Sequence, residues 1–277
     1  MKYTCLILLW SLFATMALPA DNLIQSISIV PCPESITPGT GYFTFSGKTD
    51  FTVENEEQAE VARCFSALFT QAAGFTPCVK VGEKKGKISF LTDDALKSEA
   101  YHLEITPRQI IVKASDTKGF FYALQTIRQL LPASIEGTAV AETADWSVPA
   151  MTIKDEPRFG YRGLMVHLVD DNGWRIEIKR YPLLTEIGSR RVDRPGKSFP
   201  ERRNPRQGES TVEKGFYTQE DIREIVAYAA RHQVEVIPEI EMPAHSNAAL
   251  ASYPLLACPV VDKFIGVLPG LGGNHAD

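Results

Sequence analysis

Residues 234–245 (VEVIPEIEMPAH) constrain the fold of this chain more than any other segment. Val234 and Val236 begin a short β-branched run, and Glu239 and Glu241 follow at a spacing of two residues. A spacing of two places both carboxylates on one face of an extended chain. The segment therefore predicts a strand that ends in acidic side chains.

The residues before this segment predict an amphipathic helix. Thr218 and Asp221 have the spacing of a capping box. An apolar stripe at helical spacing follows, formed by Ile222, Ile225, Val226 and Ala229. A helix followed by a carboxylate-tipped strand is the repeat of a β/α barrel, in which chemistry occurs at the carboxyl ends of the strands.

Composition limits the class of protein. The chain has 277 residues, of which 44% are hydrophobic and 23% are charged, enough apolar material for one large domain or two smaller ones. The formal net charge is −5, and no long basic run is present. These values argue against nucleic acid as the main partner and favour a neutral or small substrate.

The first 20 residues have the pattern of a secretory signal peptide. Lys2 precedes an apolar stretch from Cys5 to Leu18, and small residues end at Ala20. The stretch is short for a bilayer span. We therefore expect cleavage near Asp21, export to the periplasm or the extracellular space, and no membrane span in the mature chain.

Four cysteines remain after this cleavage: Cys32, Cys64, Cys78 and Cys258. Their spacing matches neither a dense disulfide scaffold nor a paired metal site. Buried free thiols are the simplest interpretation. Cys64 and Cys78 are the pair closest in sequence, so a bridge between them is the alternative.

Residues 21–150 predict a small α/β domain that precedes the barrel. Helical spacing runs through residues 61–72, ended by Gly74, and through residues 119–131. Alternating apolar segments predict strands over residues 27–30, 43–45, 51–53, 87–91, 101–105 and 109–114. No catalytic constellation occurs here, so we interpret this domain as structural or accessory. Residues 137–157 have little periodicity and predict a linker.

Residues 151–277 predict an incomplete (β/α)8 barrel of the TIM type. Residues 159–166 suit its first strand, and the arginine-rich residues 189–215 suit a solvated loop, because acids are interspersed. A full barrel takes about 250 residues. The chain from Asp155 onward has room for about half of one.

Two clusters could carry chemistry at neighbouring strand ends. One contains His167, Asp170 and Asp171, and the other contains Glu239, Glu241 and His245. Imidazole and carboxylate groups together permit a carboxylate–histidine relay that tunes a general acid.

Two other interpretations of these clusters stay open. His167, Asp170, Glu239 and His245 could instead ligate a metal ion. In the third interpretation, the two aspartates only form a turn before Asn172, and His245 caps a helix.

Three motifs resemble the β-N-acetylhexosaminidases of glycoside hydrolase family 20. They are residues 161–165 (YRGLM), 167–182 (HLVDDNGWRIEIKRYP) and 237–245 (IPEIEMPAH). The helical residues 119–131 (GFFYALQTIRQLL) and the order of the two domains resemble the same family. The resemblance covers nearly all of residues 25–277 and favours the relay over the metal site, because the family needs no metal or other cofactor.

The resemblance implies removal of terminal β-linked N-acetylglucosamine or N-acetylgalactosamine from glycans by retaining hydrolysis. In this family the 2-acetamido carbonyl of the substrate attacks the anomeric carbon, an Asp holds the acetamido group, and the adjacent Glu protonates the leaving oxygen. By motif match, Asp170 and His245 would support the protonation of that Glu. The substrate-binding residues implied by the motifs are His167, Asp171, Trp174 and Glu241.

The sequence departs from the family pattern in two places. The adjacent Asp–Glu pair normally follows a Gly-Gly, whereas Gly272 and Gly273 precede Asn274 and His275. The first strand motif also meets residue 167 directly, although a parallel crossover needs a dozen or more residues. We therefore expect impaired hydrolysis from this chain. A non-catalytic carbohydrate-binding or fragment protein is the alternative function.

Overall fold

The structure is a computed structural model that describes residues 27–83, 85–165, 173–192, 205–213, 215–240, 245–258 and 264–267. The chain divides into two compact units, Met1–Gly160 and Tyr161–Asp277, and each is described by itself.

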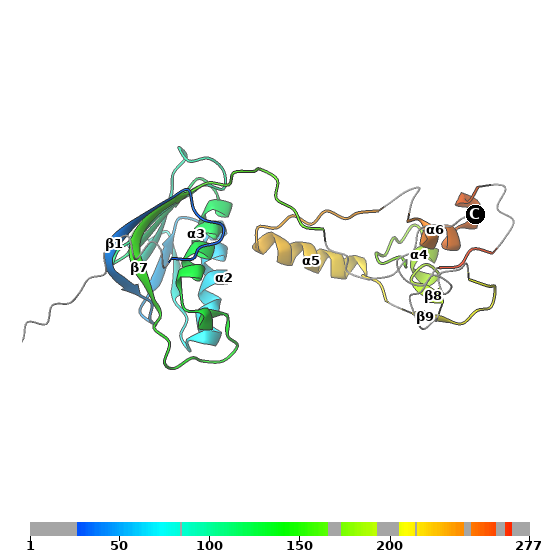
Figure 1. Cartoon of the computed structure of the whole chain (residues 1–277), viewed down its shortest axis with the longest axis horizontal. Coiled ribbons are helices and arrows are strands. Elements are labelled where there is room, and N and C mark those ends of the chain that lie inside the picture. The colour runs from blue at the N-terminus through cyan, green and yellow to red at the C-terminus, as the bar shows by residue number, and fades with distance from the viewer. Residues whose placement is uncertain are drawn as a thin grey trace, which may run out of the picture. The chain divides into compact units, whose positions relative to one another are not determined.

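The first unit is a seven-stranded mixed sheet with two helices on one face (Figure 1). The strand order is β1-β7-β5-β6-β4-β2-β3. The strands are β1 (Ser35–Thr44), β2 (Asp50–Val53), β3 (Cys78–Val81), β4 (Ile88–Thr92), β5 (Tyr101–Ile105), β6 (Ile110–Ala114) and β7 (Ser147–Asp155). The helices are α2 (Glu56–Ala72), α3 (Thr117–Leu130) and the short 3-10 helix η1 (Ala133–Glu136).

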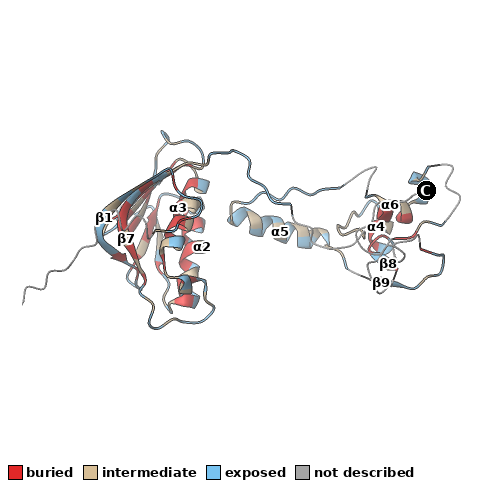
Figure 2. Ribbon diagram, viewed as in Figure 1, coloured by how far each residue is buried: buried red, intermediate tan, exposed pale blue. Residues whose placement is uncertain are grey.

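The core of this unit lies between the sheet and the two long helices (Figure 2). Alternate residues of each strand point at the helices, and apolar stripes of α2 and α3 cover them. Phe90 of β4 stacks on Phe120 of α3, with ring centroids 4.6 Å apart. Burial of this aromatic surface is the main stabilising contribution to the unit.

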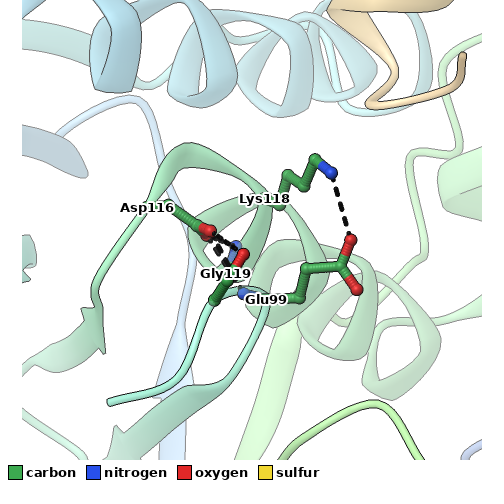
Figure 3. Close-up of polar contacts among 5 residues, drawn as sticks. Glu99, Asp116, Lys118 and Gly119 are labelled. Atoms are coloured by element: carbon green, nitrogen blue, oxygen red, sulfur yellow. Dashed lines mark hydrogen bonds and ion pairs between the residues drawn. The ribbon is translucent and has the colours of Figure 1, made fainter. Parts of the chain in front are cut away.

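The start of α3 is fixed by a compact set of polar contacts (Figure 3). Asp116 is the N-cap, and its carboxylate accepts hydrogen bonds from the backbone N–H of Gly119 at 2.9 Å and from that of Glu99. Glu99 has a φ of +69°, and its carboxylate pairs with Lys118 at 3.2 Å. These contacts compensate for the left-handed backbone at Glu99 and join α3 to the start of β5.

Several predicted elements of this unit are confirmed. β5 coincides with the predicted residues 101–105, and β4 and β6 lie within one residue of the predicted ranges. β5 and β6 pair as an antiparallel hairpin, and Thr106 and Pro107 lie in the turn between them. Both predicted helices also form.

Two predictions for the unit are wrong. Residues 27–30 form no strand; the backbone N–H and C=O of Val30 bond to the Gln129 side chain and not to a neighbouring strand. Residues 147–155, within the predicted linker, form β7, which pairs with β1 and β5. This strand continues past residue 150, the domain boundary that we predict from the sequence. Pro149 is tolerated in β7 because the register of β1 shifts between Pro38 and Tyr42.

The second unit contains several short elements and one longer helix. They are α4 (Leu183–Glu186), β8 (Arg190–Val192), β9 (Thr211–Glu213), α5 (Gln219–Arg231), α6 (Asn247–Ser252) and the 3-10 helix η3 (Pro254–Leu256). β8 and β9 pair as an antiparallel ribbon. Ala248, Ala251 and Val267 form a small buried cluster.

The capping box predicted for α5 is confirmed, but α5 buries none of its residues. Asp221 donates its backbone N–H to the Thr218 hydroxyl at 3.1 Å, and Thr218 donates its backbone N–H to the Asp221 carboxylate at 2.8 Å. The Thr218 hydroxyl, which donates to the Asp221 carboxylate at 2.7 Å, and the Thr218 backbone N–H hold the pKa of Asp221 below its ordinary value. Val226, in the apolar stripe, is 45% exposed.

The two strands predicted for the barrel do not form in the described residues. Residues 159–165 and 234–240 have no strand partner, and Leu164 and Ile237 are largely exposed. A strand exists only when a neighbouring strand accepts its backbone hydrogen bonds, which residue spacing cannot guarantee.

No helix among the described residues is long and apolar enough to cross a bilayer. The predicted signal peptide, residues 1–20, lies outside the described residues. Among the described residues, Cys32, Cys64, Cys78 and Cys258 form no disulfide, so the alternative bridge between Cys64 and Cys78 is wrong. The interpretation of the cysteines as buried is also wrong for Cys32, Cys78 and Cys258, which are exposed.

Candidate functional site

The structure describes part of the predicted site. His167, Asp170, Asp171 and Glu241 lie outside the described residues, whereas Trp174, Glu239 and His245 lie within them. The proximity of the two clusters at neighbouring strand ends therefore stays a prediction.

Trp174 links the second motif to the helix that follows the third. Its indole N–H donates to the carbonyl of Ile176 at 2.5 Å, and its backbone N–H donates to Gly188 at 2.8 Å. The half-buried ring packs against the cluster that contains Ala248 and Ala251 of α6. Since α6 begins two residues after His245, this packing places Trp174 of the second motif against the helix that follows the third motif.

His245 and Glu239 lie on exposed backbone in the described residues. His245 has a φ of +48°, which is uncommon for a residue with a side chain. Ser246, not His245, is the N-cap of α6, and it makes no side-chain capping bond. The interpretation of His245 as the cap of this helix is therefore wrong.

Two residues of the second motif hold the site region together, and the sequence did not reveal them. The Arg175 guanidinium donates from Nη1 to the carbonyls of Ser189 at 2.9 Å and Gly215 at 2.8 Å. The Glu177 carboxylate accepts the backbone N–H of Gln219, the first residue of α5, at 3.0 Å.

A backbone pairing adds to these contacts. Ile176 and Tyr217 form a parallel bridge, with Tyr217 N–H donating to Arg175 at 2.7 Å. These contacts join residues about 40 positions apart, so local spacing carries no signal for them. The second motif therefore positions the start of α5 as well as α6.

Within the residues that the structure describes, no group of three or more His, Cys, Asp or Glu side chains is arranged to hold a metal ion. His167 and Asp170, two of the four residues of the metal hypothesis, lie outside those residues. The metal site and the relay both depend on residues outside the described part of the chain, so both stay predictions.

Comparison with known proteins identifies both parts of the chain. Residues 26–156 match the family model described as "Glycosyl hydrolase family 20, domain 2", and residues 161–267 match "Glycosyl hydrolase family 20, catalytic domain". The two matches occur in the same order as the two compact units.

Individual relatives agree with these matches. A β-hexosaminidase of Porphyromonas gingivalis is 36% identical over 267 residues, which is 84% of this chain and 32% of the relative. An N,N'-diacetylchitobiase of Vibrio harveyi is 37% identical over 195 residues, 58% of this chain and 21% of the relative. The similarity therefore extends across both units, although this chain spans about a third of the P. gingivalis relative.

A solved structure supports the fold. A mutant β-hexosaminidase of Streptomyces plicatus, in complex with the product GlcNAc, has a TM-score of 0.72 and 31% identity. The similarity covers 88% of this chain and 52% of the solved chain. The predicted fold class, a small α/β domain followed by part of a β/α barrel, is confirmed. With both domain matches in order and relatives along its length, the chain belongs to glycosyl hydrolase family 20.

Proposed function

We propose that this chain contributes the accessory domain and part of the catalytic domain of a glycosidase that removes terminal β-linked N-acetylhexosamine. The observation that carries the proposal is the pair of family 20 matches at residues 26–156 and 161–267. The β-hexosaminidase name of the P. gingivalis relative and the GlcNAc in the S. plicatus complex support GlcNAc-containing glycans as substrates.

The proposed reaction is substrate-assisted and retaining. The 2-acetamido carbonyl of the sugar attacks the anomeric carbon while a Glu protonates the leaving oxygen. Asp170 and His245 tune the protonation of that Glu, and no cofactor takes part. His167, Asp171, Trp174 and Glu241 shape the sugar pocket. The packing of Trp174 against α6 supports the convergence of the second and third motifs.

In this proposal, residues 1–277 alone do not catalyse the reaction. The Asp–Glu pair that performs it in the family has no counterpart in residues 246–277, where Gly273 precedes Asn274. We expect the purified 277-residue polypeptide to release no nitrophenol above the blank from 4-nitrophenyl N-acetyl-β-glucosaminide. Sustained turnover that disappears in the Asp170→Asn variant would show that this polypeptide contains a complete site.

Calorimetry with N-acetylglucosamine separates the alternative function from the proposed one. Saturable binding without turnover indicates a carbohydrate-binding protein. The proposal predicts that the 277-residue polypeptide shows no saturable binding and no turnover. Export is part of the proposal as well, and N-terminal sequencing of the secreted protein should begin at or near Asp21.

A further inference from the structure

The sheet of the first unit has a second face, opposite the one that α2 and α3 cover (Figure 1). Along β5, Tyr101, Leu103 and Ile105 are buried, whereas His102 is half-buried and Glu104 is exposed. Side chains alternate between the faces of a strand, so His102 and Glu104 point to the uncovered face.

Three nitrogen-bearing side chains form a row across this face. His102 of β5 is directly opposite Lys154 of β7 on one side and Lys113 of β6 on the other. Neighbouring strands lie about 4.8 Å apart, so the two lysine Cα atoms are about 10 Å apart across the strands. We call residues 154, 102 and 113 the cationic row.

The charges of the cationic row are not compensated within the described part of the chain. Lys113 and Lys154 form no ion pair there, whereas Lys80, Lys97 and Lys118 each pair with a carboxylate. Because β5 lies between β6 and β7, the repulsion between Lys113 and Lys154 acts across His102 and not between neighbouring strands.

The nearby acids do not face the lysines directly. Glu104 lies two residues along β5, opposite Thr152 on one side and Ile111 on the other. Asp93 contributes a field that favours protonation of His102. Burial first, then Lys154 and Lys113, lower the pKa of His102 despite this field.

We propose that the cationic row binds an acidic polysaccharide that lies across the strands, with its carboxylate or sulfate groups on Lys154 and Lys113. A single small anion would contact one end of the row, whereas a linear chain with spaced charges contacts both lysines. His102, between them, can hydrogen-bond a sugar oxygen. This site is separate from the barrel site and does not depend on the proposed function.

The residues around the row favour a polysaccharide over a nucleic acid. Among the described residues that share the face on β5, β6 and β7, there is no Phe, Tyr or Trp on which a base could stack. Duplex DNA carries one charge per about 1.7 Å and is bound by many cations, not two. Thr152, exposed beside Glu104, offers a hydroxyl to sugar hydroxyls.

The test measures binding of the full chain to immobilised chondroitin sulfate at low salt, for wild type and for the Lys113→Gln/Lys154→Gln variant. The matched control is Lys48→Gln/Lys179→Gln, which changes the net charge equally at two exposed lysines outside the row. We expect the row variant to bind at least about tenfold more weakly and the control to stay within about twofold of wild type. A Lys113→Arg/Lys154→Arg variant should retain binding.

Three outcomes would overturn the proposal. They are no binding of the wild type to chondroitin sulfate, the same loss of affinity for it in the row variant and in the Lys48→Gln/Lys179→Gln control, and binding of poly(dT) by the wild type as tight as its binding of chondroitin sulfate. Equal binding of neutral chitin oligosaccharides would also overturn it, because charge would then play no part. Thermal unfolding checks that the row variant is folded. If the double variant unfolds, the single variants Lys113→Gln and Lys154→Gln supply the same test. Each should lose part of the affinity for chondroitin sulfate.

Discussion

Gly119 shows how a single residue sets the distance between α3 and the sheet. A Cβ added at this position would collide with the backbone carbonyl of Ala100 and would lie 2.7 Å from the Cβ of Ala114. Neither atom belongs to a flexible side-chain end, so the neighbours cannot move away easily. The absence of a side chain at Gly119 therefore permits the close approach of α3.

Replacing Gly119 with Ala should destabilise the first unit by about 1–2 kcal/mol, because overpacking that costs up to about 3 kcal/mol outweighs the gain of about 1 kcal/mol that Ala normally brings to a helix. Chemical denaturation measures the change in unfolding free energy. Gly160→Ala is the control, since a Cβ there meets nothing within 4 Å. An unchanged or raised stability of Gly119→Ala would contradict the predicted collision.

Asp155, at the end of β7, predicts a pH dependence of stability. Burial raises the pKa of this carboxyl above its ordinary value, and the nearby Glu34 adds to the rise; bonds from backbone N–H groups and the Tyr101 hydroxyl oppose it. A raised pKa in the folded state means that folding favours the protonated acid. The stabilisation is complete below the unfolded pKa and is lost as the pH rises through the folded pKa.

Wild type should therefore lose stability relative to Asp155→Asn, which does not titrate, as the pH rises through that window. Urea denaturation of both proteins at several pH values measures the difference in unfolding free energy. A difference that stays constant, or that grows in favour of wild type with rising pH, would disprove the assignment.

Helix α5 is held by its capping box and by Glu177, not by burial. The hydroxyl of Thr218 accepts the Asp221 N–H, and no residue of α5 is buried. Packing energy therefore contributes little to this helix, and its local stability depends on the hydrogen bonds at its start.

Thr218→Ala should destabilise the first turn of α5 by about 1 kcal/mol. Amide hydrogen exchange at residues 219–222 should accelerate about fivefold, whereas exchange in α2 and α3 should not change. Thr218→Ser retains the hydroxyl and should resemble wild type. Acceleration that spreads to the first unit, or none at all, would count against a local cap.

Elements with local signals could be predicted from the sequence, and those that depend on distant partners could not. Helical spacing over residues 119–131 predicts α3, and alternation over residues 101–105 predicts β5. β7 was missed because Pro149 breaks its alternation and its partners β1 and β5 lie far away in sequence.

The site follows the same rule. His245 and Trp174 are recognisable by their motifs, but the packing of Trp174 against α6 and the bonds of Arg175 join distant segments. No residue spacing encodes such contacts. The motifs therefore identify candidate residues, and the structure supplies their supporting contacts.

The part of the chain that matches the catalytic domain exposes several large apolar side chains. Val226 of α5 is 45% exposed, and Val234, Ile237 and Ile240 are each more than half exposed. Large exposed apolar surfaces favour association between proteins. The chain spans about half of the solved S. plicatus relative, so the contacts of a complete barrel are not all supplied by these residues.

The purified chain should therefore self-associate as its concentration rises. Light scattering after size-exclusion chromatography should show a growing mean mass for wild type and a smaller growth for Val226→Glu/Ile237→Glu. The control Val30→Glu/Val140→Glu adds the same charge at exposed positions of the first unit. If the mean mass of both variants grows to the same extent, the added charge alone would explain the reduced self-association.

The distance between Asp170 and His245 tests the central claim most directly, because the relay requires these two side chains to lie close together. Cysteines replace both residues, and a short bis-maleimide spanning about two strand spacings, near 10 Å, links thiols that lie close together. The background has serine at Cys32, Cys64, Cys78 and Cys258. The control pair is Asp170→Cys with Arg231→Cys, because Arg231 ends α5 before the strand segment begins.

Mass spectrometry of the digested monomer identifies the linked peptides. We expect a link between positions 170 and 245 and none between positions 170 and 231. Absence of the 170–245 link, although both thiols react with a monofunctional maleimide, would contradict the family 20 arrangement of this site.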